Sequence, residues 1–164
     1  MIETERLLLR KPAAADVEDP PLFLADPRVM DFLGGVEEPH GVVQQWLKEW
    51  ETYPAGKFIV ETSAGERIGR VGANFYDPVR WVRSASPDAE LELTWALAHE
   101  HWGHGYATEA ALAVRTWLDA PRVFSLITAA NVRSQRVAHR LGARPGRTIE
   151  LPGYGPHVVW THPL

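Results

Sequence analysis

The stretch from residue 89 to residue 110, AELELTWALAHEHWGHGYATEA, constrains the possible folds more than any other part of the chain. Residues 89–98 alternate in polarity, as expected for a strand with one apolar face. The apolar face carries Leu91, Leu93, Trp95 and Leu97, and the opposite face carries Glu90, Glu92, Thr94 and Ala96. Two glycines then precede a helical pattern over residues 108–118. A strand that passes through a glycine loop into a helix indicates a sheet with helices packed on it.

Strand-like and helix-like segments are mixed along the rest of the chain. Further strands are expected over residues 6–11, 57–62, 67–75, 122–129, 147–150 and 157–162. Helices are expected over residues 41–51 and 132–141, and two short helical pieces, interrupted by prolines, over residues 13–35. Residues 76–88 read as a long loop. This order predicts an α/β (α+β) fold with a mixed sheet.

Length and composition favour an ordinary globular protein with one domain over residues 1–164. The net charge of −4 and the lack of a basic run argue against nucleic-acid binding. The chain has no cysteine, which excludes disulfides and thiolate chemistry. Because the sequence shows neither a signal peptide nor a membrane span, we expect a soluble cytoplasmic protein with no membrane partner.

The loop itself, HEHWGHG, allows two interpretations. His99, His101 and His104 suggest a metal site, but their spacing does not match the helical i, i+4 pair of a zinc motif and no further ligand lies nearby. We therefore expect no metal. The alternative is a phosphate site, because Gly103 and Gly105 allow a close backbone turn and the following helix start offers unpaired N–H groups.

The kind of phosphate ligand stays open on these residues alone. A Rossmann dinucleotide loop needs a third glycine, and a Walker loop needs a G-K-[ST] ending; the stretch has neither. Two glycines could also do no more than close a tight strand–helix turn.

Three segments together resemble one family. W-G-H-G-Y-A-T-E-A at residues 102–110 resembles the acetyl-CoA loop of the GNAT N-acetyltransferases, whose pattern is [Q/R]-x-x-G-x-[G/A], with Trp102 in place of Gln or Arg. N-V-R-S-Q-R-V-A-H-R-L-G-A at residues 131–143 resembles a second family segment. T-E-R-L-L-L-R-K-P and D-P-R-V-M-D-F-L-G-G resemble the family's N-terminal strand and helix. The form of the loop is similar to that of the RimJ/RimL-like branch, the ribosomal-protein N-terminal acetyltransferases and their relatives.

The resemblance implies the GNAT fold, a mostly antiparallel sheet of about six to seven strands flanked by about four helices. It implies acetyl-CoA as cosubstrate, held by the loop residues Trp102, Gly103, His104, Gly105, Tyr106, Ala107 and Thr108. Leu97 and Ala98, at a bulge of the central strand, would pair with the pantetheine arm and hold the acetyl carbonyl. By analogy, a homodimer is possible.

The resemblance also implies roles on the last helix. Asn131 would bond the pantetheine and Ser134 would lie near the thioester sulfur. Many family members have a tyrosine where this chain has Ala138, so Ser134 or a water must protonate the leaving thiolate.

Acetyl transfer requires an amine without its extra proton, which a carboxylate can remove directly or through water. Glu92 is the first candidate and Glu90, on the same face of the strand, is the rival; both could instead be solvated surface carboxylates. We therefore expect an N-acetyltransferase that joins acetyl-CoA and a primary amine in a ternary complex. The alternative is a catalytically silent acyl-CoA-binding module. The acceptor is not specified. Trp81, flanked by arginines in the loop over residues 76–88, is either a packed anchor of that loop or an exposed side chain that lines the acceptor site.

Overall fold

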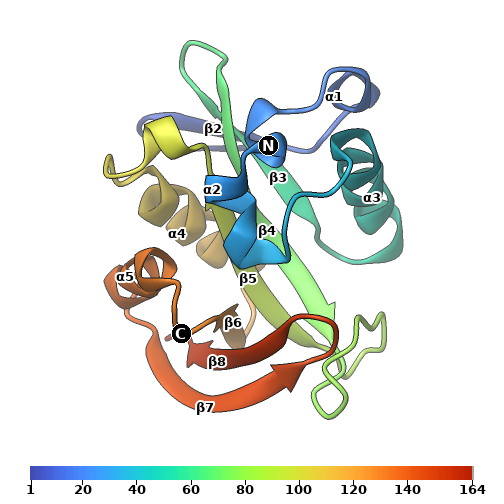
Figure 1. The fold of residues 1–164 in the computed structure, drawn as a ribbon, viewed down its shortest axis with the longest axis vertical. Coiled ribbons are helices and arrows are strands. Elements are labelled where there is room, and N and C mark those ends of the chain that lie inside the picture. Colours follow the sequence, from blue (N-terminus) through green and yellow to red (C-terminus); the bar gives the residue numbers. More distant parts are fainter. Residues whose placement is uncertain (164) are drawn as a thin grey trace.

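Strand β5 (Glu90–Leu97) lies near the middle of one eight-stranded sheet, whose strands follow the order β1-β2-β3-β4-β5-β6-β8-β7. The structure, a computed structural model, describes residues 1–163 (Figure 1). The other strands are β1 (Ile2–Glu3), β2 (Leu7–Arg10), β3 (Lys57–Thr62), β4 (Arg67–Tyr76), β6 (Val123–Ile127), β7 (Arg144–Leu151) and β8 (Gly155–Thr161). The described pairs are antiparallel except β5 with β6, which confirms the predicted mixed, mostly antiparallel sheet.

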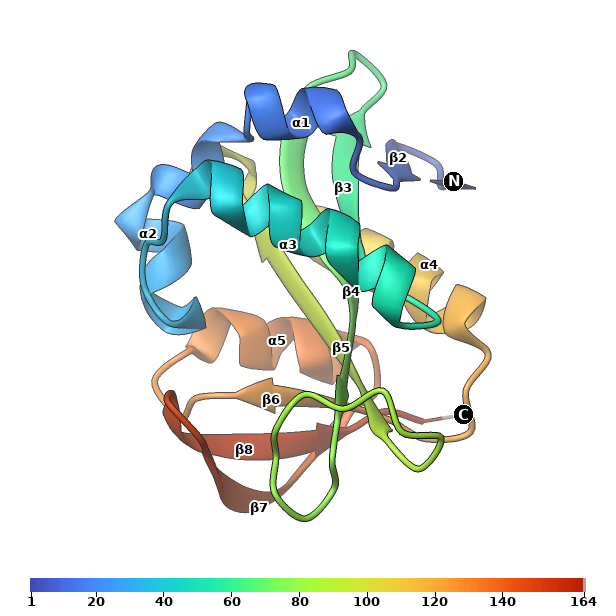
Figure 2. The ribbon, with the colours of Figure 1, turned by 90° about the vertical axis from the view of Figure 1, so that its right-hand side faces the viewer.

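The parallel pair β5–β6 is short and leaves the sheet open. The two strands pair only at Leu91 with Val123 and at Glu92 with Phe124. Beyond these residues β5 runs diagonally away from β6 (Figure 2). From Leu93 to Leu97, one edge of β5 therefore has no neighbouring strand, although its other edge pairs continuously with β4.

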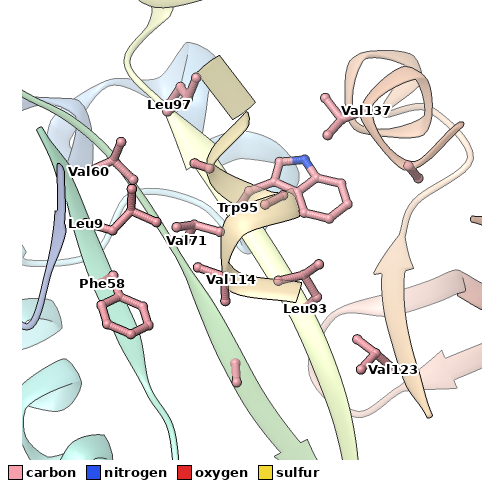
Figure 3. Close-up of a cluster of buried hydrophobic side chains, with 14 of the residues drawn as sticks. Leu9, Phe58, Val60, Val71, Leu93, Trp95, Leu97, Val114, Val123 and Val137 are labelled. Atoms are coloured by element: carbon pink, nitrogen blue, oxygen red, sulfur yellow. The ribbon is translucent and has the colours of Figure 1, made fainter. Parts of the chain in front are cut away.

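Helices cover both faces of the sheet. The face that carries Ile59 packs against α2 (Pro27–Met30) and α3 (Pro39–Thr52), through residues such as Val43 and Trp46. The opposite face packs against α4 (Tyr106–Leu118) and α5 (Val132–Arg140). Figure 3 shows this second cluster, in which the Trp95 ring extends from β5 toward Val137 of α5. Each fully buried aliphatic side chain of these clusters contributes about 1.5–3 kcal/mol to stability.

The N-terminal region is more broken than predicted. Instead of two helical pieces it has α1 (Ala14–Glu18), η1 (Leu22–Ala25), α2 and η2 (Asp31–Leu33), because the prolines at 20, 21 and 27 interrupt the backbone hydrogen bonding. Other elements agree closely: β3 spans the predicted 57–62, and α4 begins two residues before the predicted 108. Across residues 1–163, no helix is long and apolar enough to cross a membrane.

Candidate active site

Two cavities meet at the open edge of β5. The first, of about 480 Å³, lies between α4, α5 and the glycine loop, and the second, of about 730 Å³, lies over the opposite face beside α3 and β4. Phe32 and Leu33 of η2 line both. A small cavity of about 30 Å³ lies between them, with Glu92 shared with the second cavity and Ser134 shared with the first. A ligand in each cavity could therefore contact the other across β5.

The glycine loop, after the short helix η3 (His99–His101), carries a run of free backbone donors. Gly103 and Gly105 have φ of +80° and +81°, a left-handed conformation that L side chains rarely adopt. Within the described chain, none of the N–H groups from Gly103 to Thr108 donates a hydrogen bond, and no side chain caps α4. Such a run, at the positive end of a helix dipole, is a suitable site for a pyrophosphate.

Arg6 of the N-terminal segment holds this loop from outside. Its Nη1 donates to the carbonyl of His104 at 2.9 Å, and its guanidinium pairs with Glu109 of α4 at 2.6 Å. The guanidinium also lies over the Tyr106 ring, 4.6 Å from its centroid. The conformation of the loop is thereby fixed without a side chain that would cover its N–H groups.

The three histidines point to separate partners. His99 contacts Arg28, His101 contacts Glu66, and the exposed His104 ring stacks on Tyr106 at 5.7 Å. Among residues 1–163 no three His, Cys, Asp or Glu side chains form a group that could hold a metal. The His104 imidazole does not line the first cavity, so only its backbone belongs to the predicted phosphate site.

Ala98 is a correction to the predicted site. Its N–H donates to Ile68 O at 2.7 Å, so it is not available to hold a pantetheine or acetyl oxygen, and its carbonyl already accepts the His101 N–H. The predicted bulge is also absent from the β4–β5 pairing, where Gly69 to Tyr76 pair in continuous register with Leu97 to Glu90.

The peptide groups of Leu97 and Ala98 point to opposite sides of β5, because peptide groups alternate along a strand. The carbonyl of Leu93 accepts from Ser125 and that of Leu97 from the Trp102 indole at 2.9 Å, so these residues direct their peptide groups away from β4. The Leu97 N–H therefore faces the open edge. Trp102, the departure from the family pattern, binds the end of β5 to the loop.

Helix α5 places Asn131 and Ser134 at the first cavity. The Asn131 Oδ1 caps the helix by accepting the Ser134 N–H at 3.2 Å, which leaves its Nδ2 as a donor. Ser134 also reaches the small cavity between the two larger ones. Ala138 is completely buried and offers no hydroxyl.

Three arginines of α5 form a part of the site that was missed from the sequence. Arg133, Arg136 and Arg140 line the first cavity, and the Arg133 guanidinium lies 3.8 Å from the centroid of the Trp102 ring. Their spacing of three and four residues puts them on one helical face, which was the available signal. They give a phosphate-bearing ligand a positive wall.

Glu92, the first candidate base, is buried rather than solvated. It is 6% exposed, and its Oε2 accepts a hydrogen bond from Asn74 Nδ2 at 2.7 Å. Burial raises the pKa of this carboxyl above its usual value, against the opposing effect of the Asn74 hydrogen bond. Glu90 lies outside all three cavities, is partly exposed and lies 3.7 Å from Arg122. The arrangement favours Glu92.

A buried charged network extends from Glu92 across the second cavity. Asn74 also accepts a hydrogen bond from Lys57 Nζ, which donates to Glu49 Oε2 at 2.9 Å. Arg83 donates to the other Glu49 oxygen at 3.1 Å. Burial lowers the pKa of Lys57 to about 8. On β4 the sequence held a signal for this network, because Arg70, Asn74 and Tyr76 alternate with apolar residues.

Of the two alternatives for Trp81, the structure agrees with a packed loop anchor and not with an exposed side chain. It is 8% exposed and packs edge-on against Phe124, with a centroid separation of 5.4 Å, beside Ile149 and Leu151. Its φ of +56° turns the loop so that the ring points inward. Trp81 therefore anchors the loop over residues 76–88 and lines the second cavity with its buried ring.

Replacing Gly105 with valine is expected to raise the KM for acetyl-CoA about tenfold or more, because losing one or two hydrogen bonds to a charged ligand has roughly that effect. The matched control is Gly65→Val, since Gly65 has a similar φ of +79° in the β3–β4 turn with open space around it. Both variants should lose similar thermal stability. Equal KM values for acetyl-CoA in the two variants would refute the role of the loop.

Comparison with known proteins finds acetyltransferases of similar sequence and fold. The family model described as acetyltransferase (GNAT) domain matches residues 6–144. The curated protein YkkB of Bacillus subtilis (strain 168), described as uncharacterized, is 28% identical over 137 residues, covering 78% of this chain and 75% of that protein. The crystal structure of an acetyltransferase from Agrobacterium tumefaciens str. C58 is 31% identical, with a TM-score of 0.80, and covers 99% of this chain and 94% of that one. An aminoglycoside acetyltransferase solved in complex with coenzyme A shares the fold at a TM-score of 0.77 and 18% identity, covering 95% of this chain and 94% of that one.

Proposed function

Because the chain belongs to the acetyltransferase (GNAT) domain family, and is therefore an acyl-CoA-dependent N-acetyltransferase, we propose that it acetylates a primary amine by direct attack in a ternary complex. The observation that carries this proposal is the junction of the two cavities at β5, with Glu92 on one side and Ser134 on the other. Holding both reactants at such a junction supplies much of the rate of a bimolecular transfer without a covalent enzyme intermediate.

The first cavity has the donors that acetyl-CoA, the cosubstrate of the family, requires. The N–H groups from Gly103 to Thr108 and the arginines of α5 would hold its phosphates.

Glu92 would act on the amine from the second cavity. A protonated amine cannot attack a thioester, and Glu92 would take the extra proton directly or through a water. A backbone N–H near Leu97, on the open edge of β5, would stabilise the negative charge that develops on the carbonyl oxygen, and Glu92 would then reach the amine through water. Ser134 or a water would return a proton to the leaving thiolate, since Ala138 cannot.

The RimJ/RimL-like branch is the finer assignment that we propose. Its support is the loop W-G-H-G-Y-A-T-E-A, in which Tyr106 takes part in the Arg6 contact that holds the loop. This assignment does not name the acceptor, because the acceptor cavity is built from other segments.

Thiol release from acetyl-CoA, measured with a panel of amines and paired with mass spectrometry of the amine, tests the proposal. We expect coenzyme A and the N-acetyl amine in equal amounts with at least one acceptor. Tight binding of coenzyme A without turnover of any amine would instead support the catalytically silent module.

A further inference from the structure

The floor of the second cavity has a surplus of positive groups. Its buried or partly buried charged side chains are Glu49, Lys57, Arg70, Arg83 and Glu92. Three are cations and two are carboxylates, and burial keeps the Glu92 carboxyl protonated to a higher pH than usual. Lys57 and Arg83 are both ion-paired to Glu49, at 2.9 Å and 3.1 Å. Both cations therefore have a carboxylate partner, although this one carboxylate balances only one of the two positive charges.

Arg70 is the cation without such a partner. In residues 1–163 its guanidinium donates a hydrogen bond only to Thr94 Oγ1, at 2.9 Å, and it forms no ion pair within 4.0 Å. A guanidinium has five N–H donors, so most of them face the cavity without an acceptor. Because Arg70 is only partly buried and lines the cavity, an anionic group of a ligand could replace water on these donors without breaking an ion pair.

The position of Arg70 relative to Glu92 sets the size of that ligand. Thr94, which Arg70 contacts, and Glu92 project from the same face of β5 with one residue between them. Alternate residues on a strand are roughly 7 Å apart, so a small molecule can reach both sites. Its amine would lie at Glu92, near the junction with the first cavity, and its anionic group would lie at Arg70.

The acidic residues of the cavity do not contradict this assignment. Glu37 and Glu38 lie at its exposed rim. The Glu38 carboxylate accepts the N–H groups of His40 and Gly41 and thus caps α3. Neither glutamate compensates Arg70.

We infer that the acceptor is a small amine that also carries an anionic group, a carboxylate or a phosphate, which Arg70 binds while the amine faces Glu92. This inference rests on the proposed acetyl transfer to an amine. It disfavours polycations such as polyamines and aminoglycosides, because their additional positive groups would face Lys57, Arg70 and Arg83.

Acceptors that differ only in the anionic group test the inference. Thiol release from acetyl-CoA would be measured with α- and β-amino acids against their carboxamides, with phosphoethanolamine against ethanolamine, and with spermidine. The amino acids and the phosphate ester distinguish the two sources of the anion. We expect kcat/KM about tenfold or more higher for the anionic member of at least one pair, the effect of one charge-assisted bidentate contact.

Arg70→Gln should remove this preference. The KM for the preferred anionic acceptor should rise about tenfold, that for its neutral counterpart should not change, and Arg70→Lys should restore part of the preference. The KM for acetyl-CoA should stay the same. The control is Arg80→Gln, because Arg80 is exposed and lies outside the cavity.

Turnover of neutral or polycationic amines in preference to anionic ones, or equal losses for both members of a pair in Arg70→Gln, would overturn the inference and leave N-acetyl transfer intact. If none of the tested amines caused thiol release from acetyl-CoA, the proposed function would be contradicted as well.

Discussion

Replacing Glu92 with glutamine is expected to lower kcat about 10²- to 10⁴-fold at neutral pH, the usual contribution of a positioned general base. Glutamine has nearly the same shape, and its Oε1 can still accept the hydrogen bond that Asn74 donates to Glu92. The KM for acetyl-CoA should be unchanged, because the glycine loop that we propose holds the coenzyme phosphates lines the other cavity. Steady-state kinetics with acetyl-CoA and a turned-over amine measure both constants.

The pH profile provides a second test of the Glu92 assignment. Because burial raises the pKa of Glu92, the wild-type rate should rise with pH through that raised value. The variant lacks this step and should recover at high pH, where the amine loses its proton unaided. Glu90→Gln is the control and should keep most of the activity. If Glu90→Gln is instead the damaging change, Glu90 is the base.

Glu92→Gln should lower the activity of the protein without lowering its thermal stability. A carboxyl whose pKa is raised on folding contributes stability below its unfolded pKa, and that stability is lost as the pH rises through the folded value. At neutral pH the buried charge therefore destabilises the wild type, and the melting temperature of the variant should be equal or higher. A large loss of stability would show that Glu92 has mainly a structural role.

Lys57→Met is expected to lower the free energy of unfolding by about 1–3 kcal/mol, since the buried Glu49 carboxylate loses one of its two cationic partners. Lys57 is 4% exposed and donates to Glu49, which is 3% exposed, so the remaining carboxylate would have only Arg83. Lys57 also donates to Ala73 O at 3.2 Å, and this carbonyl would lose that donor. Chemical denaturation of both proteins measures the difference.

Two further variants distinguish the effect of losing the ion pair from the effect of losing a lysine. Lys48→Met removes an exposed lysine from the neighbouring helix and should change stability by less than about 0.5 kcal/mol. Lys57→Met combined with Glu49→Leu should be at least as stable as Lys57→Met alone, because a buried carboxylate that has lost one of its two cations is removed, while the partly exposed Arg83 can be solvated. A double variant that is less stable than the single one would contradict this account.

The sequence predicted the framework and the backbone turn of the glycine loop because their signals are local. Alternation over residues 89–98 identified β5, and Gly103 and Gly105 identified the left-handed turn before α4. The limits of β3 were predicted at both ends, since an apolar run between turn residues has few alternatives.

The acceptor cavity could not be predicted in the same way, because its residues come from separate elements. Lys57, Arg70 and Glu92 lie on three strands, and their proximity depends on the register of β3 with β4 and of β4 with β5. For Trp81 the sequence left both a packed and an exposed side chain open, because a polar loop gave no sign of a positive φ that turns the ring inward. Ala98 was misassigned because alternating peptide directions depend on where the strand ends.

A crystal structure of the protein with bound acetyl-CoA would test the central claim most directly. The account predicts pyrophosphate oxygens within hydrogen-bond distance of N–H groups between Gly103 and Thr108, and the thioester at the junction of the cavities, beside the Leu97 N–H and Ser134. A coenzyme bound elsewhere, or a thioester that does not reach the open edge of β5 opposite Glu92, would contradict it.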